Sequence, residues 1–87
     1  MGCIMYTVYV LRSLKTGYRY IGQTTDLARR LTEHNLGMTK SIKFQLPFIL
    51  EHSEEFTTRI EVVRREKFLK SGQGRQWLNE NVGTKSP

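Results

Sequence analysis

Two short runs near the start of the chain decide its fold: residues 6–14, with the sequence YTVYVLRSL, and residues 18–23, with the sequence YRYIGQ. Both are rich in β-branched and aromatic residues, which favour strands. The segment between them ends in Gly17, which can adopt the positive φ that a tight turn needs. The two runs therefore predict a β-hairpin, in which Tyr20 and Gly22 share one face of the second strand.

A helix and a third strand are expected after the hairpin. Thr24, Thr25 and Asp26 are N-cap candidates for a helix that ends near Leu36, where Gly37 is a good terminator. Residues 47–52 indicate a strand, with Pro47 at its start, where a missing N–H is tolerated.

The last third of the chain predicts two further helices. Thr58 and Glu61 fit a capping box, which opens a helix that runs to about Lys70. Residues 71–74 (SGQG) predict a break, and residues 75–81 a short helix after it. The order β-β-α-β-α-α indicates an α/β (α+β) fold in which a small mixed sheet is flanked by helices.

Composition limits the classes of function. The 87 residues allow one domain, and the single cysteine excludes both an internal disulfide and a cysteine-based zinc site. No apolar run approaches the roughly 20 residues that span a bilayer, so no membrane partner is expected and a cytoplasmic location follows by default. The 14 basic residues against 8 acidic ones give a charge of +6. This excess favours a polyanionic partner such as nucleic acid, although structural proteins share the signal.

Glu66 is the least expected residue of the predicted helices. Val62 and Val63 precede it by four and three residues, and Leu69 follows by three, so its carboxylate is expected to point into an apolar stripe. Burying an unpaired carboxylate costs several kcal/mol, so a metal, another cation or a hydrogen-bond network should match it. A structural salt bridge, for example to Arg30, is the alternative, and the residues by themselves leave both open.

Arg30 and His34 lie four residues apart and therefore on one face of the first helix. The planar guanidinium suits a phosphate oxygen, and an imidazole can donate or accept a proton near neutrality. Tyr9 and Tyr20 on the hairpin could hydrogen-bond a nucleophilic water or a phosphate. Taken singly, each of these residues could equally be an ordinary surface or packing residue.

Several blocks in order along the chain resemble one known family. Residues 7–9 (TVY) and 20–22 (YIG) resemble the two tripeptides that name the GIY-YIG nuclease superfamily, and residues 26–37, Pro47 and residues 65–72 continue the match. Thr and Val stand where the first tripeptide has Gly and Ile, which is similar to the small bacterial single-domain branch. The chain also resembles the N-terminal nuclease domain of the excision-repair incision subunit.

The resemblance implies a three-stranded antiparallel sheet between helices, formed by a nuclease domain at residues 5–81, with residues 1–4 as an extension and residues 82–87 as a flexible tail. It implies a metal-dependent endonuclease with one Mg²⁺ or Mn²⁺ held by Glu66. Arg30 would stabilise the phosphate, and Tyr20 would orient the attacking water with help from Tyr9 or His34. These five catalytic candidates are expected to line one concavity.

The expected substrate is nucleic acid, DNA rather than RNA, bound by a homodimer or within a larger repair complex. Six residues are the candidates for substrate binding: Gly22, Gln23, Arg29, Asn35, Lys40 and Lys43. Residues 42–45 depart from the family, because related proteins have a hydroxyl residue and arginines in that loop. This departure keeps open a non-catalytic nucleic-acid-binding or adaptor module on the same fold.

Overall fold

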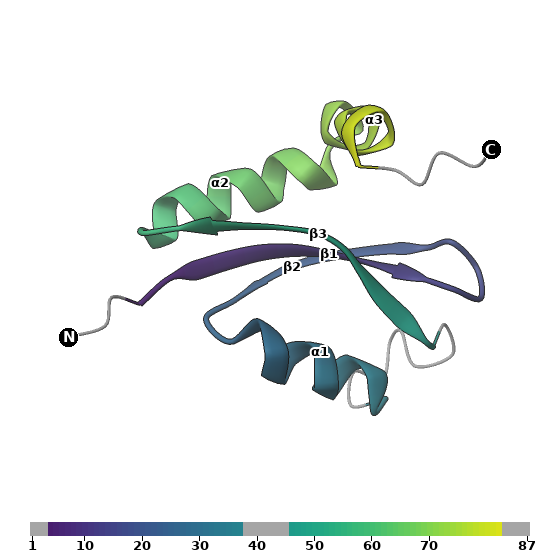
Figure 1. Cartoon of the computed structure of the whole chain (residues 1–87). Coiled ribbons are helices and arrows are strands. Elements are labelled where there is room, and N and C mark those ends of the chain that lie inside the picture. Colours follow the sequence, from purple (N-terminus) through teal and green to yellow (C-terminus); the bar gives the residue numbers. More distant parts are fainter. Residues whose placement is uncertain (1–3, 38–45, 83–87) are drawn as a thin grey trace.

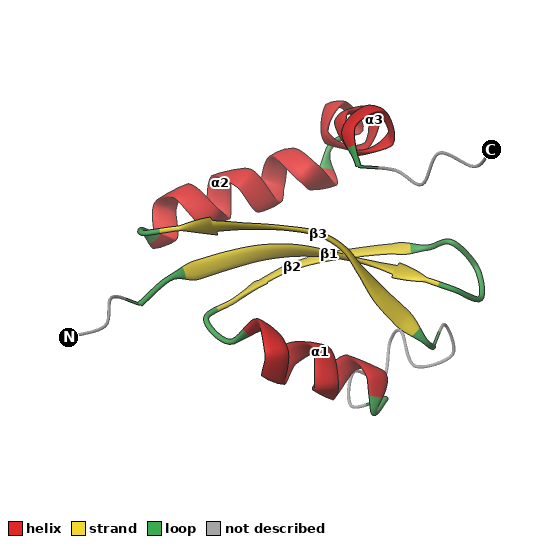
Figure 2. Cartoon of the chain, viewed as in Figure 1, coloured by secondary structure: helices red, strands yellow, loops and turns green. Residues whose placement is uncertain are grey.

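A three-stranded antiparallel sheet forms the middle layer of the computed structural model, which describes residues 4–37 and 46–82. The elements follow the chain as β1 (Tyr6–Ser13), β2 (Arg19–Thr24), α1 (Leu27–Asn35), β3 (Phe48–Phe56), α2 (Arg59–Lys70) and α3 (Gly72–Asn81). Helix α1 covers one face of the sheet, and α2 and α3 cover the other (Figure 1, Figure 2). The predicted α/β fold and its order β-β-α-β-α-α are therefore confirmed.

The central strand β1 supplies side chains to both sides of the core. The strand order is β2-β1-β3, so β1 pairs on both sides, while β2 and β3 each pair on one side within the described part of the chain. Val8 and Val10 pack against α2 and α3, whereas Tyr9 and Leu11 pack toward α1, as the two-residue period of a strand requires. Because β2 is an edge strand, side chains from both faces of the sheet can meet along its outer side.

The predicted turn and caps are present. Gly17 and Gly37 have φ of 80° and 78°, which places them at the hairpin turn and just after α1. Asp26 caps α1 by accepting a backbone N–H bond from the first turn at 3.1 Å. Thr58 caps α2 by accepting the backbone N–H of Glu61 at 3.2 Å, and its hydroxyl donates to the Glu61 carboxylate at 2.9 Å.

Strand β3 is longer than the sequence predicts. The residue pattern predicts a strand at residues 47–52, but β3 begins at Phe48 and continues to Phe56. The additional residues include two glutamates, which are poor strand formers by themselves. They stay extended because this half of β3 pairs in register with β1, from Tyr9 opposite Ser53 to Tyr6 opposite Phe56.

Helix α3 starts earlier than the sequence predicts. Ser71 alone separates α2 from α3, rather than the whole of residues 71–74. Its backbone N–H donates to the carbonyl of Phe68, and its hydroxyl accepts the N–H of Gly74 at 3.1 Å, so one residue ends α2 and caps α3. A Cβ at Gly74 would overlap the carbonyl oxygen of Phe68. Gly74 therefore permits a tight elbow between two helices rather than a loop.

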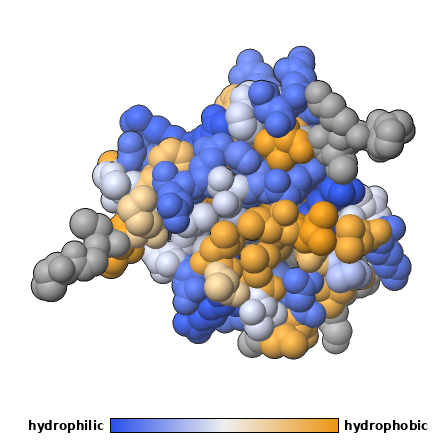
Figure 3. All heavy atoms as spheres, in the orientation of Figure 1, coloured by the Kyte–Doolittle hydropathy of each residue, from blue (hydrophilic) through white to orange (hydrophobic). Residues whose placement is uncertain are grey.

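Hydrophobic and hydrophilic residues occupy different parts of the surface in the view of Figure 3. Hydrophobic residues gather around α1 and the adjoining part of the sheet, whereas α2 and α3 present mainly hydrophilic residues. The exposed large hydrophobic side chains include Leu36, just after α1, and Ile49 and Leu50 on β3. Among the described residues, no helix is both long enough and apolar enough to cross a bilayer.

Candidate functional site

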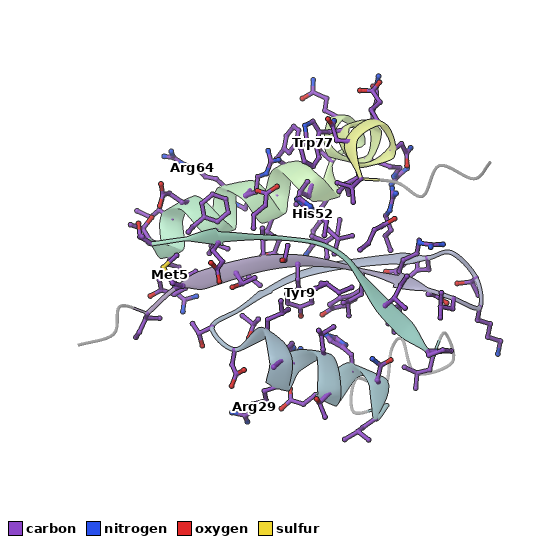
Figure 4. All side chains as sticks on the ribbon, viewed as in Figure 1. Met5, Tyr9, Arg29, His52, Arg64 and Trp77 are labelled. Carbon is purple, nitrogen blue, oxygen red and sulfur yellow. The ribbon has the colours of Figure 1, made fainter. Side chains whose placement is uncertain are left out.

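An aromatic cluster with one arginine lies between the sheet and α1. The ring of Tyr20 lies 4.7 Å from that of His34 and 6.3 Å from that of Tyr9, measured between centroids. Arg30 reaches the same cluster from α1, since its Nε donates to the Tyr9 hydroxyl at 3.3 Å. Figure 4 shows Tyr9 in this position, between the sheet and α1. Four of the five predicted catalytic residues therefore lie together.

Hydrogen bonds join the residues of the cluster. The Tyr9 oxygen accepts from Arg30 at 3.3 Å and lies 3.2 Å from His34 Nε2, in a bond whose donor depends on the imidazole tautomer. Burial raises the pKa of Tyr9 and lowers that of His34, which Arg30 lowers further. Both groups are therefore neutral near pH 7. Both side chains are buried, and the Tyr9 hydroxyl is the one that bonds Arg30.

Arg30 lies at the rim of this cluster. Hydrogen bonds to Tyr9 and Glu33 hold its pKa above the usual value, so it stays charged. Its Nη1 donates to Glu33 at 3.0 Å, and Arg29 donates to the other oxygen of the same carboxylate at 3.1 Å. Arg30 remains 37% exposed. It is therefore a partly accessible cation with a fixed position.

Gly22 stands opposite Tyr9 in the register of β1 and β2. A Cβ at this position would lie 2.7 Å from the Tyr9 hydroxyl oxygen and 3.2 Å from the Tyr20 ring. Gly22 is buried, so its contribution is the space that it leaves for the Tyr9 hydroxyl.

Glu66 projects from α2 on the other face of the sheet. One carboxylate oxygen accepts from the Gln23 amide at 2.9 Å, and the other lies 2.8 Å from Lys70 Nζ. The side chain is 18% exposed, so it lies at the border of the apolar stripe rather than inside it. Its recorded ion pair is with Lys70, one turn along the same helix, and not with Arg30.

A cavity of about 350 Å³ beside β2 brings the two faces together. Tyr20, from the aromatic cluster, and Glu66, from α2, both line it. Arg30 does not line this cavity but a separate pocket, together with Asp26 and Glu33. The expectation that all five catalytic candidates line one concavity is therefore wrong: Tyr20 and Glu66 line this cavity, Arg30 lines another pocket, and Tyr9 and His34 are buried.

The described residues offer a single carboxylate at this cavity. They contain no group of three or more His, Cys, Asp or Glu side chains that could hold a metal ion. Mg²⁺ is a hard cation that keeps several waters and is often bound through one or two carboxylates. The Lys70 ammonium already places a positive charge against the Glu66 oxygen. The donor set therefore fits a weakly held, water-rich divalent cation.

The candidates for substrate binding lie in different surroundings. Gln23 bonds Glu66, whereas Arg29 is 75% exposed on the outer side of α1 (Figure 4). Both ends of the Asn35 amide bond the backbone of Phe48, at 3.2 Å and 2.9 Å, which ties α1 to β3. We therefore give Asn35 a structural role. Lys40 and Lys43, like residues 42–45, lie outside the described residues.

Two further residues at the cavity, Lys70 and Arg75, were not predicted as site residues. Lys70 follows Glu66 by four residues, a spacing that predicts an ion pair on a helix. Arg75 lines the same cavity from α3. No local pattern marks Arg75, because its approach to β2 depends on the elbow at Ser71.

The comparison with protein families decides the family. The model of the GIY-YIG catalytic domain matches residues 5–79. The chain belongs to the GIY-YIG family. This family is of the nuclease type. Residues 7–9 and 20–22, which resemble its two naming tripeptides, lie on β1 and β2, where Tyr9 pairs with Gly22.

Individual relatives of this GIY-YIG chain agree with the family match. A UPF0213 protein of Halobacterium salinarum is 40% identical over 67 residues, which cover 76% of the chain and 86% of the relative. A UPF0213 protein of Streptococcus pneumoniae is 37% identical over 78 residues, covering 85% and 78%. The solution NMR structure of a UPF0213 protein from Bacillus halodurans is 31% identical with a TM-score of 0.57, covering 92% of this chain and 88% of that one. These names state no activity.

Proposed function

We propose that this chain is an endonuclease that hydrolyses a nucleic-acid phosphodiester, with DNA as its first candidate substrate. One observation carries the proposal: Tyr20 and Glu66, from opposite faces of the sheet, line one cavity at the β2 edge. A phenol, a carboxylate and the neighbouring Arg30 guanidinium can act on one phosphate there.

Each side chain has a distinct part in the proposed reaction. Tyr20 orients the water that attacks the phosphorus, while the 3′ oxygen leaves. Arg30 binds phosphoryl oxygens, whose negative charge grows as the water attacks. The Tyr9 hydroxyl, which is also bonded to His34, holds the guanidinium of Arg30 in place. Gly22 leaves the space that this hydroxyl occupies.

Glu66 would hold a divalent cation, with Gln23 fixing the orientation of its carboxylate and Lys70 moving aside. When bound, Mg²⁺ or Mn²⁺ supplies Lewis-acid stabilisation of charge on the phosphate. Gln23 and the outward-facing Arg29 remain our candidates for contacts to the substrate backbone, together with Lys40 and Lys43. One such site cuts one strand at a time, so a double-strand break would need a homodimer or a partner complex.

A cleavage assay tests the proposal. Labelled branched, nicked and single-stranded DNA is incubated with the protein and Mg²⁺ or Mn²⁺, and with EDTA as the metal-free control. The expected product is absent with EDTA and reduced at least about a hundredfold in Glu66→Gln, a loss comparable to that of one transition-state contact. Glu80→Gln is the matched control, since Glu80 is an exposed glutamate on α3 whose recorded hydrogen bond is to Gln76. Equal cleavage by the wild type and Glu66→Gln would overturn the assignment.

One observation favours a second candidate, a non-catalytic nucleic-acid-binding module. Both oxygens of Glu66 are already satisfied, one by Gln23 and one by Lys70. The carboxylate could then be purely structural. Salt-sensitive binding without any metal-dependent product from these DNA forms or from RNA would select this function.

A further inference from the structure

A second cavity adjoins the one that contains Glu66. It measures about 440 Å³ and is lined by Arg12, Gly17, Tyr18, Arg19, Arg75 and Asn79. Three of these residues, Tyr18, Arg19 and Arg75, also line the first cavity. The two cavities therefore share a wall and follow the border of β2 toward the hairpin turn. Neither the family match nor the proposed reaction gives this second cavity a role.

The second cavity carries an excess of positive charge. Three arginines line it, and two of them, Arg12 and Arg19, contact the carboxylate of Glu51, whose side chain is 6% exposed. Each guanidinium nitrogen of Arg19 already donates, to Glu51 at 2.7 Å and 3.3 Å and to Asn79 at 2.7 Å. Three positive charges against one negative charge leave an excess of two beside the cavity.

Arg12 and Arg75 have donors to spare. Arg12 Nε is buried, makes no hydrogen bond and lies 3.5 Å from a carboxylate oxygen of Glu51, while the Arg12 side chain as a whole is 26% exposed. Arg75 is exposed in the first turn of α3 and has no side-chain ion pair or hydrogen bond recorded with any residue in 4–37 or 46–82. An anion with several oxygens could accept hydrogen bonds from the exposed part of Arg12 and from Arg75 together. The chemistry of the site therefore matches a phosphate.

An exposed aromatic ring stands beside these arginines. Tyr18 is 47% exposed, lines both cavities and makes no ring stacking contact within the described residues. An exposed phenol next to a phosphate site can stack an unpaired base, as in proteins that bind single strands. A base-paired nucleotide would not offer its face to the ring, so an unpaired strand fits this arrangement better than a duplex.

We propose that the second cavity binds the phosphate of a nucleotide next to the cleavage position, on a single strand that runs along β2 from the Glu66 cavity. Arg75 and Arg12 bind the phosphate, Arg19 and Asn79 keep the wall in place, and Tyr18 stacks the base. The inference rests on the proposed function, since it extends the path of the same substrate.

Binding without cleavage tests this path. A fluorescein-labelled strand of twelve thymidines is titrated with the full chain in EDTA, and anisotropy gives Kd at several salt concentrations. Arg75→Ala is expected to weaken binding about tenfold, the effect of one charge-assisted hydrogen bond. It should also lower the slope of log Kd against log salt by about 0.7, the value for one phosphate contact on a single strand.

Arg64→Ala is the matched control, because Arg64 is also exposed and carries the same charge. It lies on α2, well away from the hairpin turn (Figure 4). The thermal unfolding midpoint of each variant shows that it is folded. Arg12→Ala should resemble Arg75→Ala, whereas Arg64→Ala should stay within about twofold of the wild type. If Arg75→Ala and Arg64→Ala have the same Kd and salt slope, the path is overturned.

Inorganic phosphate separates a nucleic-acid strand from a free anion. It is titrated in the same buffer, and Tyr18→Leu is compared with the wild type for both ligands. We expect the strand to bind at least tenfold more tightly than phosphate, and Tyr18→Leu to weaken only the strand, since stacking of a base contributes about tenfold or more. Equal affinities, with no effect of Tyr18→Leu, would make this a free-anion site and contradict the path.

The proposed function and the strand path are tested by different measurements. The proposed function is tested by comparing cleavage by the wild type and by Glu66→Gln in the presence of metal, whereas the strand path is tested by binding affinities in EDTA. Active cleavage with identical binding by Arg75→Ala and Arg64→Ala would refute the path alone. An inactive protein whose strand binding depends on Arg75 would refute the nuclease alone.

Discussion

At the scale of single residues, Tyr9 occupies its position because its partner on β2, Gly22, has no side chain. Its hydroxyl lies where a side chain at Gly22 would begin, and there it accepts from Arg30 and bonds His34. A strand glycine often marks such a close approach. The glycine of the second tripeptide thus has a packing reason that is independent of any substrate.

Gly22→Ala should therefore displace Tyr9 and, with it, Arg30. The added Cβ would lie 2.7 Å from the hydroxyl oxygen, and we expect a loss of about 1–3 kcal/mol in the free energy of unfolding, as for other overpacked sites. Urea denaturation measures this loss. Gly72→Ala is the control, because no atom lies within 4 Å of its Cβ and a neutral or slightly stabilising effect is expected. An unchanged urea midpoint in Gly22→Ala would show that Tyr9 is not held by this space.

His34 should make the stability depend on pH. Burial, and secondarily Arg30, lowers its pKa below the unfolded value of about 6.5, so below that pH the unfolded chain binds a proton that the folded protein does not. The stability contributed by neutral His34 is thus present above pH 6.5 and is lost as the pH falls. The slope from this one group is at most about 1.4 kcal/mol per pH unit.

The comparison of wild type with His34→Gln between pH 7.5 and pH 5 isolates this effect. Urea midpoints at each pH should fall more steeply for the wild type, because glutamine does not titrate. The acids whose pKa values are lowered, Glu33 and Glu54, contribute to both proteins and cancel in the difference. Parallel pH profiles would contradict a neutral, buried imidazole.

At the scale of elements, the elbow between α2 and α3 places Arg75 near β2. Ser71 ends one helix and caps the next, and Gly74 allows the first turn of α3 to approach the end of α2. Leu69 and Leu78 on either side of the elbow are buried in the same core as Val8 and Val10. The direction of α3 is therefore set by one cap and one close contact.

Ser71→Ala should lower the free energy of unfolding by about 1 kcal/mol, because the N–H of Gly74 loses its acceptor. Ser71→Asp keeps an acceptor at the cap and should recover most of this loss. Thermal or urea unfolding of the two variants gives the comparison. Identical values for Ser71→Ala and the wild type would mean that the elbow is held by the core and not by the cap.

At the scale of the whole molecule, local signals predicted more of the fold than of the site. Turn glycines, caps and strand-forming runs act over a few residues, so the hairpin, α1 and the start of α2 follow from the sequence. The second half of β3 does not, because its pairing with β1 holds an acidic segment extended. The three-residue error at the start of α3 has the same kind of cause, a contact that forms only on folding.

In the candidate site, too, local patterns predicted some residues, whereas contacts that form only on folding were not predicted. Helical spacing singled out Glu66, Arg30 and His34, and the resemblance added the two tyrosines. Spacing could not show that Tyr9 and His34 are covered by Tyr20, or that Gln23 crosses to Glu66, because these contacts join β1, β2, α1 and α2. Asn35 was predicted to bind the substrate, because its position in the sequence does not show that both ends of its amide bond the backbone of β3.

The central claim is that a divalent cation at Glu66 lies beside Tyr20, where both faces of the sheet meet. Mn²⁺ tests it most directly, because trace amounts broaden the NMR signals of nearby nuclei even when binding is weak. The account predicts strong broadening at Glu66, Tyr20 and Gly22 that disappears in Glu66→Gln and persists in Glu80→Gln. Broadening that is unchanged by Glu66→Gln, or that centres on the acidic half of β3, would contradict it.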